Sequence, residues 1–422
     1  MKRLISSILL YLASRRLKKR KGKLIVVAGS VGKTTTTQAI AQVLGSRKNV
    51  IATRGNLNTE FGLPFVVLEL ENPRMTKSPL YWLGVISKAF SQSLKPLEYE
   101  MIILEIGTDR PGDIARFKKI LKADIAVVTA VSAEHMESFK SLEAVYKEEL
   151  SVADFSDKLL INSSSVPQEM QKEDSGKKYL SYGMSQSDDF SFEIIDKKQS
   201  CYEIKMNLLG DIEIANVCLI GNHMLLAALA SASVAKLVGI EGTFIGRALS
   251  QLQPQPGRMQ LLHGIEENSY IIDDSYNSSP LAAEAALDAL YELPATSRIA
   301  ILGSMNELGS YSVRAHKALG AYCRPDKLDL VVTVGEDANN YLAPASKSAG
   351  CLTKSYKTSP EAVTFVLSTL KPGSVVLVKG SQNGVFSEEA IKMLLRNPKD
   401  EAKLVRQSEE WMKIKRDQGL VV

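Results

Sequence analysis

The chain has 422 residues, which is enough for two or three domains, and its apolar content of 45% is ordinary for a globular protein. The formal net charge of +5 comes from residues 1–23, which hold nine basic residues and no acid. Without them, 43 basic residues stand against 47 acidic ones, a net charge of −4. The body is therefore mildly acidic, and nothing in it indicates a nucleic-acid partner.

The four cysteines are Cys201, Cys218, Cys323 and Cys351, and no two of them form a CxxC pair. Such wide spacing indicates a reducing compartment and argues against structural zinc. We therefore expect a cytoplasmic protein.

Residues 1–22 form a basic amphipathic leader, in which apolar residues fall on one helical face and cations follow. Its apolar stretch is about ten residues long, whereas a bilayer span needs ~20. No small-residue cleavage site follows, so a secretory signal is not expected. Two alternatives stay open: an interfacial helix that contacts anionic lipid at the inner face of the membrane, or a helix packed on the body.

The next segment carries the most informative motif of the chain. Residues 24–27 read as a buried strand, a glycine loop follows, and residues 35–44 read as a helix. Two residues separate Gly29 from Gly32-Lys33-Thr34, where the full phosphate-loop pattern has four, so we interpret the loop as a compact variant. Loop amides and the helix N-terminus favour phosphate oxygens, Lys33 is expected to reach the β- and γ-phosphates, and Thr34 is expected to bind Mg²⁺. The expected nucleotide-binding residues here are Gly29, Ser30, Val31, Gly32, Lys33, Thr34 and Thr35.

Short apolar runs then alternate with helical patterns, which is typical of a doubly wound α/β fold with a mostly parallel sheet. Further strands are expected at 101–104, 125–128 and 159–161, helices at 114–121, 142–153 and 223–239, and an edge β-region within 165–215.

A linker at 253–257, rich in Gln and Pro, precedes a second α/β set. Its strands are expected at 270–272, 299–302, 330–334 and 375–378, and its helices at 281–291, 313–322 and 360–370. We therefore predict a central P-loop ATPase domain at 23–256 and a smaller, Rossmann-like C-terminal domain at 257–396. The leader spans 1–22, and the tail, 397–422, is expected to pack on the body as a terminal helix.

Polar side chains follow several predicted strands at their carboxyl ends, where open parallel sheets bind ligands. Glu105 ends the 101–104 strand and is a good candidate metal ligand beside a magnesium–phosphate site. His135 follows the 125–128 strand. Asp273 and Asp274 follow the 270–272 strand, where they can cap a helix, bind ribose hydroxyls or orient a hydrated magnesium ion.

Several motifs occur in the order found in one family: the phosphate loop, the polar loop at 55–58, Glu105-Ile106-Gly107, the His135 segment and Asp273 to Asn277. Further matches are Gly257-Arg258-Met259, residues 302–309, His316 and Lys379-Gly380-Ser381. Over residues 24 to about 390 the chain resembles the Mur ligase family.

The resemblance implies an ATP-dependent carboxylate–amine ligase that acts through an acyl phosphate and releases ADP and phosphate. The amide-forming branch that adds D-alanyl-D-alanine to a muropeptide precursor is the most similar. The implied role is peptidoglycan synthesis, on which cell shape and division depend. The implied partners are a small-molecule or peptide–nucleotide substrate and an amino acid or dipeptide, and the oligomeric state stays open.

The resemblance also implies residue roles. Lys33 and Thr34 would serve the phosphates and a first Mg²⁺, with Glu105 as a further ligand of that ion. His135 would hold a second Mg²⁺. Arg258 and Asp274 would meet the nucleotide as the C-terminal domain closes, and Asn277 lies where relatives place nucleotide or substrate contacts.

The chain also departs from the family. Many relatives carry a carbamoylated lysine where Glu149 stands, and we favour Glu149 as ligand of the second metal, with Lys147 as the competing candidate. Met224 stands where relatives have an adenine-binding asparagine, and Gln382 where they have arginine. Only about 23 residues precede the first strand, too few for the N-terminal domain that holds the uridine nucleotide in relatives.

We therefore expect that another protein supplies that function, that the substrate is not a standard uridine-linked muropeptide, or that the substrate is lipid-linked. Two alternative functions stay open. One is a Mur-like ligase for another acceptor, of the poly-amino-acid or folyl-polyglutamate type, and the other is a non-catalytic nucleotide-binding scaffold.

Overall fold

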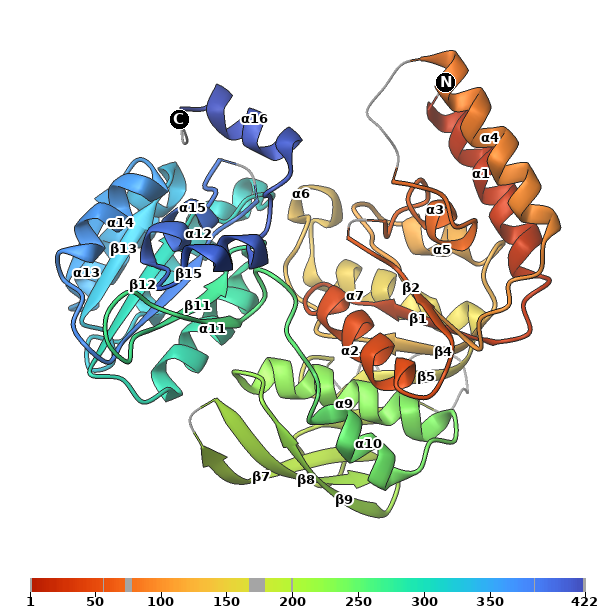
Figure 1. Ribbon diagram of the computed structural model, residues 1–422, viewed down its shortest axis with the longest axis horizontal. Coiled ribbons are helices and arrows are strands. Elements are labelled where there is room, and N and C mark those ends of the chain that lie inside the picture. Colours follow the sequence, from red (N-terminus) through yellow and green to blue (C-terminus); the bar gives the residue numbers. More distant parts are fainter. Residues whose placement is uncertain are drawn as a thin grey trace.

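The computed structural model describes residues 2–55, 57–72, 78–166, 179–198, 200–382 and 384–419, with side chains from residue 4 onward. Two sheets, each flanked by helices, are joined by the segment that follows residue 249 (Figure 1). This is the mixed α/β architecture that the sequence predicts.

The larger sheet has nine strands in the order β2-β3-β1-β4-β5-β6-β7-β8-β9. Pairing is parallel from β2 to β7 and antiparallel across β7, β8 and β9. The strands are β1 (Lys23–Ala28), β2 (Val50–Ala52), β3 (Met101–Glu105), β4 (Ala123–Val128), β5 (Ser156–Asn162), β6 (Tyr179–Gly183), β7 (Phe190–Lys198), β8 (Cys201–Leu208) and β9 (Asp211–Val217). Parts of the predicted edge β-region, residues 167–178 and 199, lie outside the described residues.

The helices around this sheet are α1 (Lys2–Leu17), α2 (Lys33–Gly45), α3 (Leu63–Val67), α4 (Pro79–Leu94), α5 (Asp113–Phe117), α6 (Met136–Phe139), α7 (Leu142–Leu150), α9 (Asn222–Leu237) and α10 (Gly242–Leu249). The sequence predicts α2, α5, α7 and α9, but α5 and α7 end early, and a 3₁₀ turn at Ser151–Phe155 follows α7. Helix α4 was not predicted.

The smaller sheet has six strands in the order β10-β11-β15-β12-β13-β14, and only its edge strand β10 pairs antiparallel among the described strands. The strands are β10 (Gln260–His263), β11 (Tyr270–Asp274), β12 (Ser297–Gly303), β13 (Leu330–Val334), β14 (Thr353–Tyr356) and β15 (Ser374–Lys379). The helices are α11 (Pro280–Glu292), α12 (Ser312–Tyr322), α13 (Ala343–Ser348), α14 (Ser359–Leu367), α15 (Glu388–Leu394) and α16 (Glu409–Asp417).

The central strands are apolar throughout because helices cover both faces of the sheet. Residues 24–28 of β1 are fully buried, and β3 and β4 flank this strand in parallel. The carboxyl ends of β1, β3 and β4 therefore meet at one edge of the sheet, and this edge carries the phosphate loop, Glu105 and the segment that leads to His135.

The basic leader forms helix α1, and its apolar face packs on the body. Ile5, Leu9 and Leu12 are at most 6% exposed, and Arg16 is buried against Glu69 and the carbonyl of Val67. Of the two alternatives for the leader, the structure has the helix packed on the body, so this apolar face is not available to lipid. Among the described residues, none of the helices has the length and apolar content that a bilayer crossing requires.

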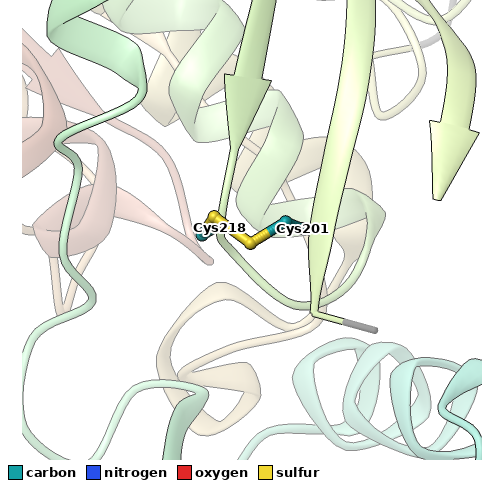
Figure 2. The surroundings of a disulfide bond; sticks show 2 residues. All are labelled: Cys201 and Cys218. Atoms are coloured by element: carbon teal, nitrogen blue, oxygen red, sulfur yellow. A yellow bond between two sulfur atoms is a disulfide. The ribbon is translucent and has the colours of Figure 1, made fainter. Parts of the chain in front are cut away.

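Cys201 and Cys218 form a disulfide bond (Figure 2). They are 17 residues apart in sequence, but the antiparallel pairing of Tyr202 with Val217 places them opposite each other at the ends of β8 and β9. The wide spacing indicates a reducing compartment, where thiols stay reduced. This pair is bonded instead, and spacing along the chain could not indicate it because it does not report the pairing of strands. Cys323 and Cys351 are free and buried.

Candidate active site

A cavity of about 300 Å³ lies between the two sheets. One wall is the phosphate loop, and the other is formed by the segments that follow β11 and β15. The predicted residues that line it are Ser30, Val31, Gly32, Lys33, Thr34, Thr35, Glu105, His135, Arg258, Asp274 and Asn277. Segments more than 200 residues apart in sequence thus face one another across a single space.

The phosphate loop requires glycine at two positions. Gly29 has a φ of 122°, and a Cβ there would lie 2.2 Å from Oγ1 of Thr129. Gly32 has a φ of 87° at the start of α2. The N–H groups of Ser30 and Val31 both donate to the carbonyl of Ala130 at 2.9 Å. The donors that remain for phosphate are therefore those of the first turn of α2, whose dipole also favours an anion.

Glu149 lies beneath this loop. Its Oε2 accepts the N–H of Gly29 at 2.7 Å, and its side chain is almost fully buried. Burial raises its pKa to about 7, although the charge of Lys33 and the N–H of Gly29 oppose that rise. Lys33 itself donates from Nζ to the carbonyls of Gly29 and Ser30. A carboxylate therefore supports the loop from below, next to its only lysine.

The first metal site of the prediction has a suitable set of oxygens. Thr34 Oγ1 donates to Glu105 Oε1 at 3.2 Å, and Asn58 Nδ2 donates to the same oxygen at 2.9 Å. The other carboxylate oxygen of Glu105 is buried and has no hydrogen-bond partner among the described residues. A buried, unpaired carboxylate oxygen beside a threonine hydroxyl fits a hard cation such as Mg²⁺.

The second metal site is not assembled as predicted. His135, with a φ of 50°, lies between Asp109 and Glu307, at 3.6 Å and 3.7 Å from their carboxylates. Glu149 instead bonds to the phosphate loop. Across the part of the chain that the structure describes, no three His, Cys, Asp or Glu side chains are placed to hold one ion together. Thr34 and Glu105 therefore lie together, whereas Glu149 contacts the phosphate loop, and its role as a ligand of the second metal stays a prediction.

Lys147, the competing candidate for the second metal, lies on the solvent side of α7. Its Nζ pairs with Glu143 Oε1 at 2.7 Å, and both side chains are more than 60% exposed. The helical period turns this face of α7 toward solvent, while Glu149, two residues on, points inward. Lys147 therefore lies away from the cavity.

On the opposite wall, Asp274 is fixed by its neighbours. Its carboxylate accepts from Lys379 Nζ at 2.5 Å and from the N–H of Met259 at 3.2 Å. Lys379 also donates to the carbonyl of Asn277 at 3.0 Å. The Arg258 guanidinium lies 4.2 Å from the centre of the Tyr276 ring. A buried ion pair thus sets the position of the residues that were predicted to meet the nucleotide.

The tail supports this wall from behind. Arg406 pairs with Glu388 at 2.5 Å and donates to the carbonyls of Ser275 and Tyr276. Lys415 of α16 is fully buried and pairs with Glu388 at 2.8 Å. Burial raises the pKa of Glu388, but the hydrogen bonds and charges of Arg406 and Lys415 outweigh it and leave that pKa below its ordinary value. The tail therefore packs on the body as expected, and it does so directly behind the loop at 275–276.

His316, matched only by resemblance, serves the same wall indirectly. It is fully buried, its Nε2 accepts the N–H of Met305 at 2.9 Å, and its Nδ1 lies 2.9 Å from the carbonyl of Ser312. Burial lowers its pKa, which suits a neutral ring that accepts at one nitrogen and donates at the other. The ring thereby anchors the segment that carries Glu307 into the cavity.

Met224 lies at the junction of two cavities. Met224 is 2% exposed and lines both the main cavity and a small adjoining pocket with Ala227, Leu252 and Gln38. The neighbouring His223 also lines the main cavity, and burial lowers its pKa to about 4. Met224 thus contributes an apolar, polarisable thioether to the cavity wall.

Sequence reasoning assigned no role to four residues that the structure brings to the site or its support: Glu134, Glu307, Lys379 and Arg406. Burial raises the pKa of Glu134, which lies near Lys33 and His135. The position next to His135 could have drawn attention to Glu134, and Lys379 stood within a quoted motif. No local pattern distinguishes Glu307 or Arg406, because their roles depend on distant partners.

A strand, a glycine loop and a helix N-terminus that face a second α/β unit define an enzyme of the P-loop nucleotide-binding class. Residues 27–235 match the Mur ligase middle domain, and residues 257–382 match the Mur ligase glutamate ligase domain. The chain therefore belongs to the Mur ligase family, whose members are ATP-dependent ligases.

Among individual proteins, the chain is 27% identical to the UDP-N-acetylmuramoyl-tripeptide–D-alanyl-D-alanine ligase of Bacillus subtilis (strain 168), over 92% of this chain and 79% of that protein. It is 25% identical to the Escherichia coli (strain K12) protein of the same name, over 89% and 77%. The structure of MurF ligase from Thermotoga maritima in complex with ADP superimposes with a TM-score of 0.77 at 24% identity, over 94% of this chain and 84% of that chain.

A folylpolyglutamate synthase of Mycobacterium tuberculosis, complexed with ADP and AMPPCP, superimposes with a TM-score of 0.65 at 16% identity, over 92% and 94%. These two structural likenesses show the shared fold.

Proposed function

We propose that the chain is an ATP-dependent ligase that joins a muropeptide carboxylate to the amine of D-alanyl-D-alanine in peptidoglycan synthesis. The observation that carries the proposal is the cavity in which Lys33, Thr34 and Glu105 face Arg258, Asp274 and Asn277, in a chain that matches both Mur ligase domains. The names of the relatives supply the substrates.

In the proposed reaction, a substrate carboxylate oxygen attacks the γ-phosphorus of ATP, the bond to ADP breaks, and an acyl phosphate forms. The amine then attacks the acyl carbon and loses a proton, and phosphate leaves with the former carboxylate oxygen. Negative charge develops on the transferred phosphoryl group and then on the tetrahedral intermediate, so fixed positive groups lower both barriers. Lys33 and the amides of α2 supply them on one side, and Arg258 on the other.

Magnesium is part of the proposal. Thr34 and Glu105 would hold the first ion, which neutralises phosphate charge when bound. For a second ion we propose His135 together with Glu134 or Glu307, while Glu149 holds the loop at Gly29. The proposed location is the cytoplasm, where ATP and nucleotide-linked precursors are made. The proposed domain limits remain 23–256 and 257–396.

The alternative acceptor rests on the likeness in fold to folylpolyglutamate synthase. It keeps the cavity chemistry and changes the carboxylate and the amine. The scaffold alternative rests on Met224 and on the glutamate at position 149.

The test is release of phosphate and ADP from Mg·ATP with UDP-muramoyl-tripeptide and D-alanyl-D-alanine, added together and singly. The proposal predicts release that needs both substrates, with an amide product whose mass equals the two substrates less one water. Turnover only with folate and glutamate would establish the alternative acceptor. If ATP binds but no carboxylate–amine pair stimulates release of ADP and phosphate, the proposal is wrong. That result would favour the non-catalytic nucleotide-binding scaffold.

A further inference from the structure

Helix α4 exposes a strip of large apolar side chains to solvent. Leu80, Leu83, Phe90 and Leu94 are 80%, 65%, 52% and 47% exposed. Their spacing of three, seven and four residues places them on one face of the helix. The other face packs on the body through Trp82 and Ala89, which are at most 8% exposed. Single exposed apolar residues are ordinary, but four along one helix form a surface that needs a partner.

The two helical segments that form this surface carry charged side chains of one sign. Residues 1–23 hold nine basic residues and residues 78–97 hold two, and neither segment contains an acid. Helices α1 and α4 lie side by side (Figure 1). The Lys19 ammonium donates to the carbonyls of Ser93 and Leu94, which places the basic end of α1 beside the last apolar residue of the strip. Apolar and cationic groups therefore form one surface.

Acids of the body oppose part of this charge. Glu69 pairs with Arg16, Asp124 with Arg20, and Glu71 lies 3.7 Å from Lys88. Lys18, Lys21 and Lys95 are exposed; Lys18 and Lys21 flank Lys19 along the chain, and Lys95 directly follows α4.

We propose that the strip on α4 and the basic end of α1 form a docking surface for an anionic lipid bilayer. Apolar side chains on an interfacial helix enter the boundary between headgroups and acyl chains, while cations near the headgroups bind lipid phosphates. A second copy of the chain is a poorer occupant, because symmetric packing through α4 would bring two acid-free, cationic segments together. An anionic lipid surface would bury the apolar strip and also bind the cations that no acid of the protein opposes.

The position of this surface suits docking. Figure 1 shows α1 and α4 at the end of the molecule that is farthest from the smaller sheet. The cavity is lined instead by the phosphate loop and by segments of the C-terminal unit. Contact with a bilayer at α4 would leave the cavity and the movement of the C-terminal unit unobstructed. The proposal is independent of the substrate assigned above.

The test is co-sedimentation of the full chain with sucrose-loaded vesicles of phosphatidylglycerol and phosphatidylcholine (3:7), against vesicles of phosphatidylcholine alone. The variant pair is Leu83→Ser with Phe90→Ser, and the matched control is Ile212→Ser with Ile214→Ser, because Ile212 and Ile214 are 55% and 56% exposed on β9. The proposal predicts binding to the anionic vesicles only, weakened about tenfold or more by the α4 pair and unchanged in the control.

A charge variant separates the two contributions. Lys18→Glu with Lys21→Glu should weaken binding by at least about fivefold per residue, and raised salt should act in the same direction. Equal binding to both vesicle types, or equal loss in the α4 and β9 pairs, would overturn the proposal. So would a dimer, seen by sedimentation velocity, that the α4 pair abolishes while no vesicle binding occurs. Thermal unfolding of each variant confirms that these exposed substitutions leave the fold intact.

Discussion

The two walls of the cavity are built in different ways. The phosphate-loop wall comes from one contiguous segment, residues 29–35, whose conformation follows from two glycines and a helix N-terminus. The opposite wall depends on partners far along the chain, because Lys379 holds Asp274 from 105 residues away, and Arg406 holds the carbonyl of Ser275 from 131 residues away. The conformation of the first wall is set mostly by its own segment, with Glu149 and the carbonyl of Ala130 as further contacts. The second wall depends more strongly on support from distant parts of the chain.

The largest effect is expected at the first wall. Lys33→Met should lower ATP-dependent turnover by about 10²–10³-fold or more, because it removes a cation from the phosphates, and it should leave stability nearly unchanged. The measurement is steady-state ADP release. The matched control is Lys48→Met, whose exposed lysine pairs with Glu100. Turnover of the Lys33 variant within twofold of the parent would contradict the assignment of this loop.

A substitution in the support of the second wall should lower stability more than turnover. Arg406→Met leaves the buried carboxylate of Glu388 with one partner fewer, so we expect a loss of about 3–5 kcal/mol in the free energy of unfolding. The KM for ATP should rise as well, because the loop at 275–276 loses its anchor. Urea titration measures the first effect and initial rates measure the second.

The control for Arg406 is Arg324→Met. The pair of Arg324 with Asp326 is exposed, so its loss should leave the free energy of unfolding nearly unchanged. If both arginine variants lost the same small amount, the tail would not be a support of this wall.

The same support predicts a pH dependence. The folded-state pKa of Glu388 lies below its ordinary value of 4.5, so the stabilisation is present above pH 4.5 and is lost as the pH falls through the lowered value. Chemical denaturation of the parent and of Glu388→Gln between pH 3 and 7 should show a smaller acid loss in the variant. Parallel curves for the two proteins would show that Glu388 does not contribute.

The smallest effect on activity is expected outside both walls. Removing the disulfide with Cys201→Ser and Cys218→Ser should cost up to about 3 kcal/mol by the loop-closure estimate, with turnover unchanged. A reductant should shift the parent to the stability of the double variant and leave the variant unaffected. A fall in turnover on reduction would instead couple this hairpin to the cavity.

The sequence predicted the first wall well because its determinants are local. Gly29, Gly32 and Lys33 fall in a strand–loop–helix pattern, and Glu105 ends an apolar run. The sequence therefore places the phosphate loop and Glu105 at the same edge of the sheet. Arg406 could not be placed, because its partners are set by how the tail folds back over β11. Helix α4 was not predicted. Apolar residues occupy its exposed face as well as its buried face, so its sequence lacks the one-sided apolar stripe that marks a helix packed on a core.

The cysteines and Glu149 show the same limit. The bond between Cys201 and Cys218 depends on strand register, and the contact of Glu149 with Gly29 depends on the direction in which α7 turns its residues. Neither the disulfide bond nor the contact of Glu149 with Gly29 could be predicted from the spacing of residues along the chain.

The central claim is that a carboxylate is activated as an acyl phosphate in this cavity. The most direct measurement uses a muropeptide whose acceptor carboxylate carries ¹⁸O in both oxygens, with ATP and D-alanyl-D-alanine, and mass spectrometry of the released phosphate. The account predicts one ¹⁸O atom in each phosphate, transferred from the carboxylate. Phosphate without the label would show that ATP is hydrolysed by water, and it would contradict the account.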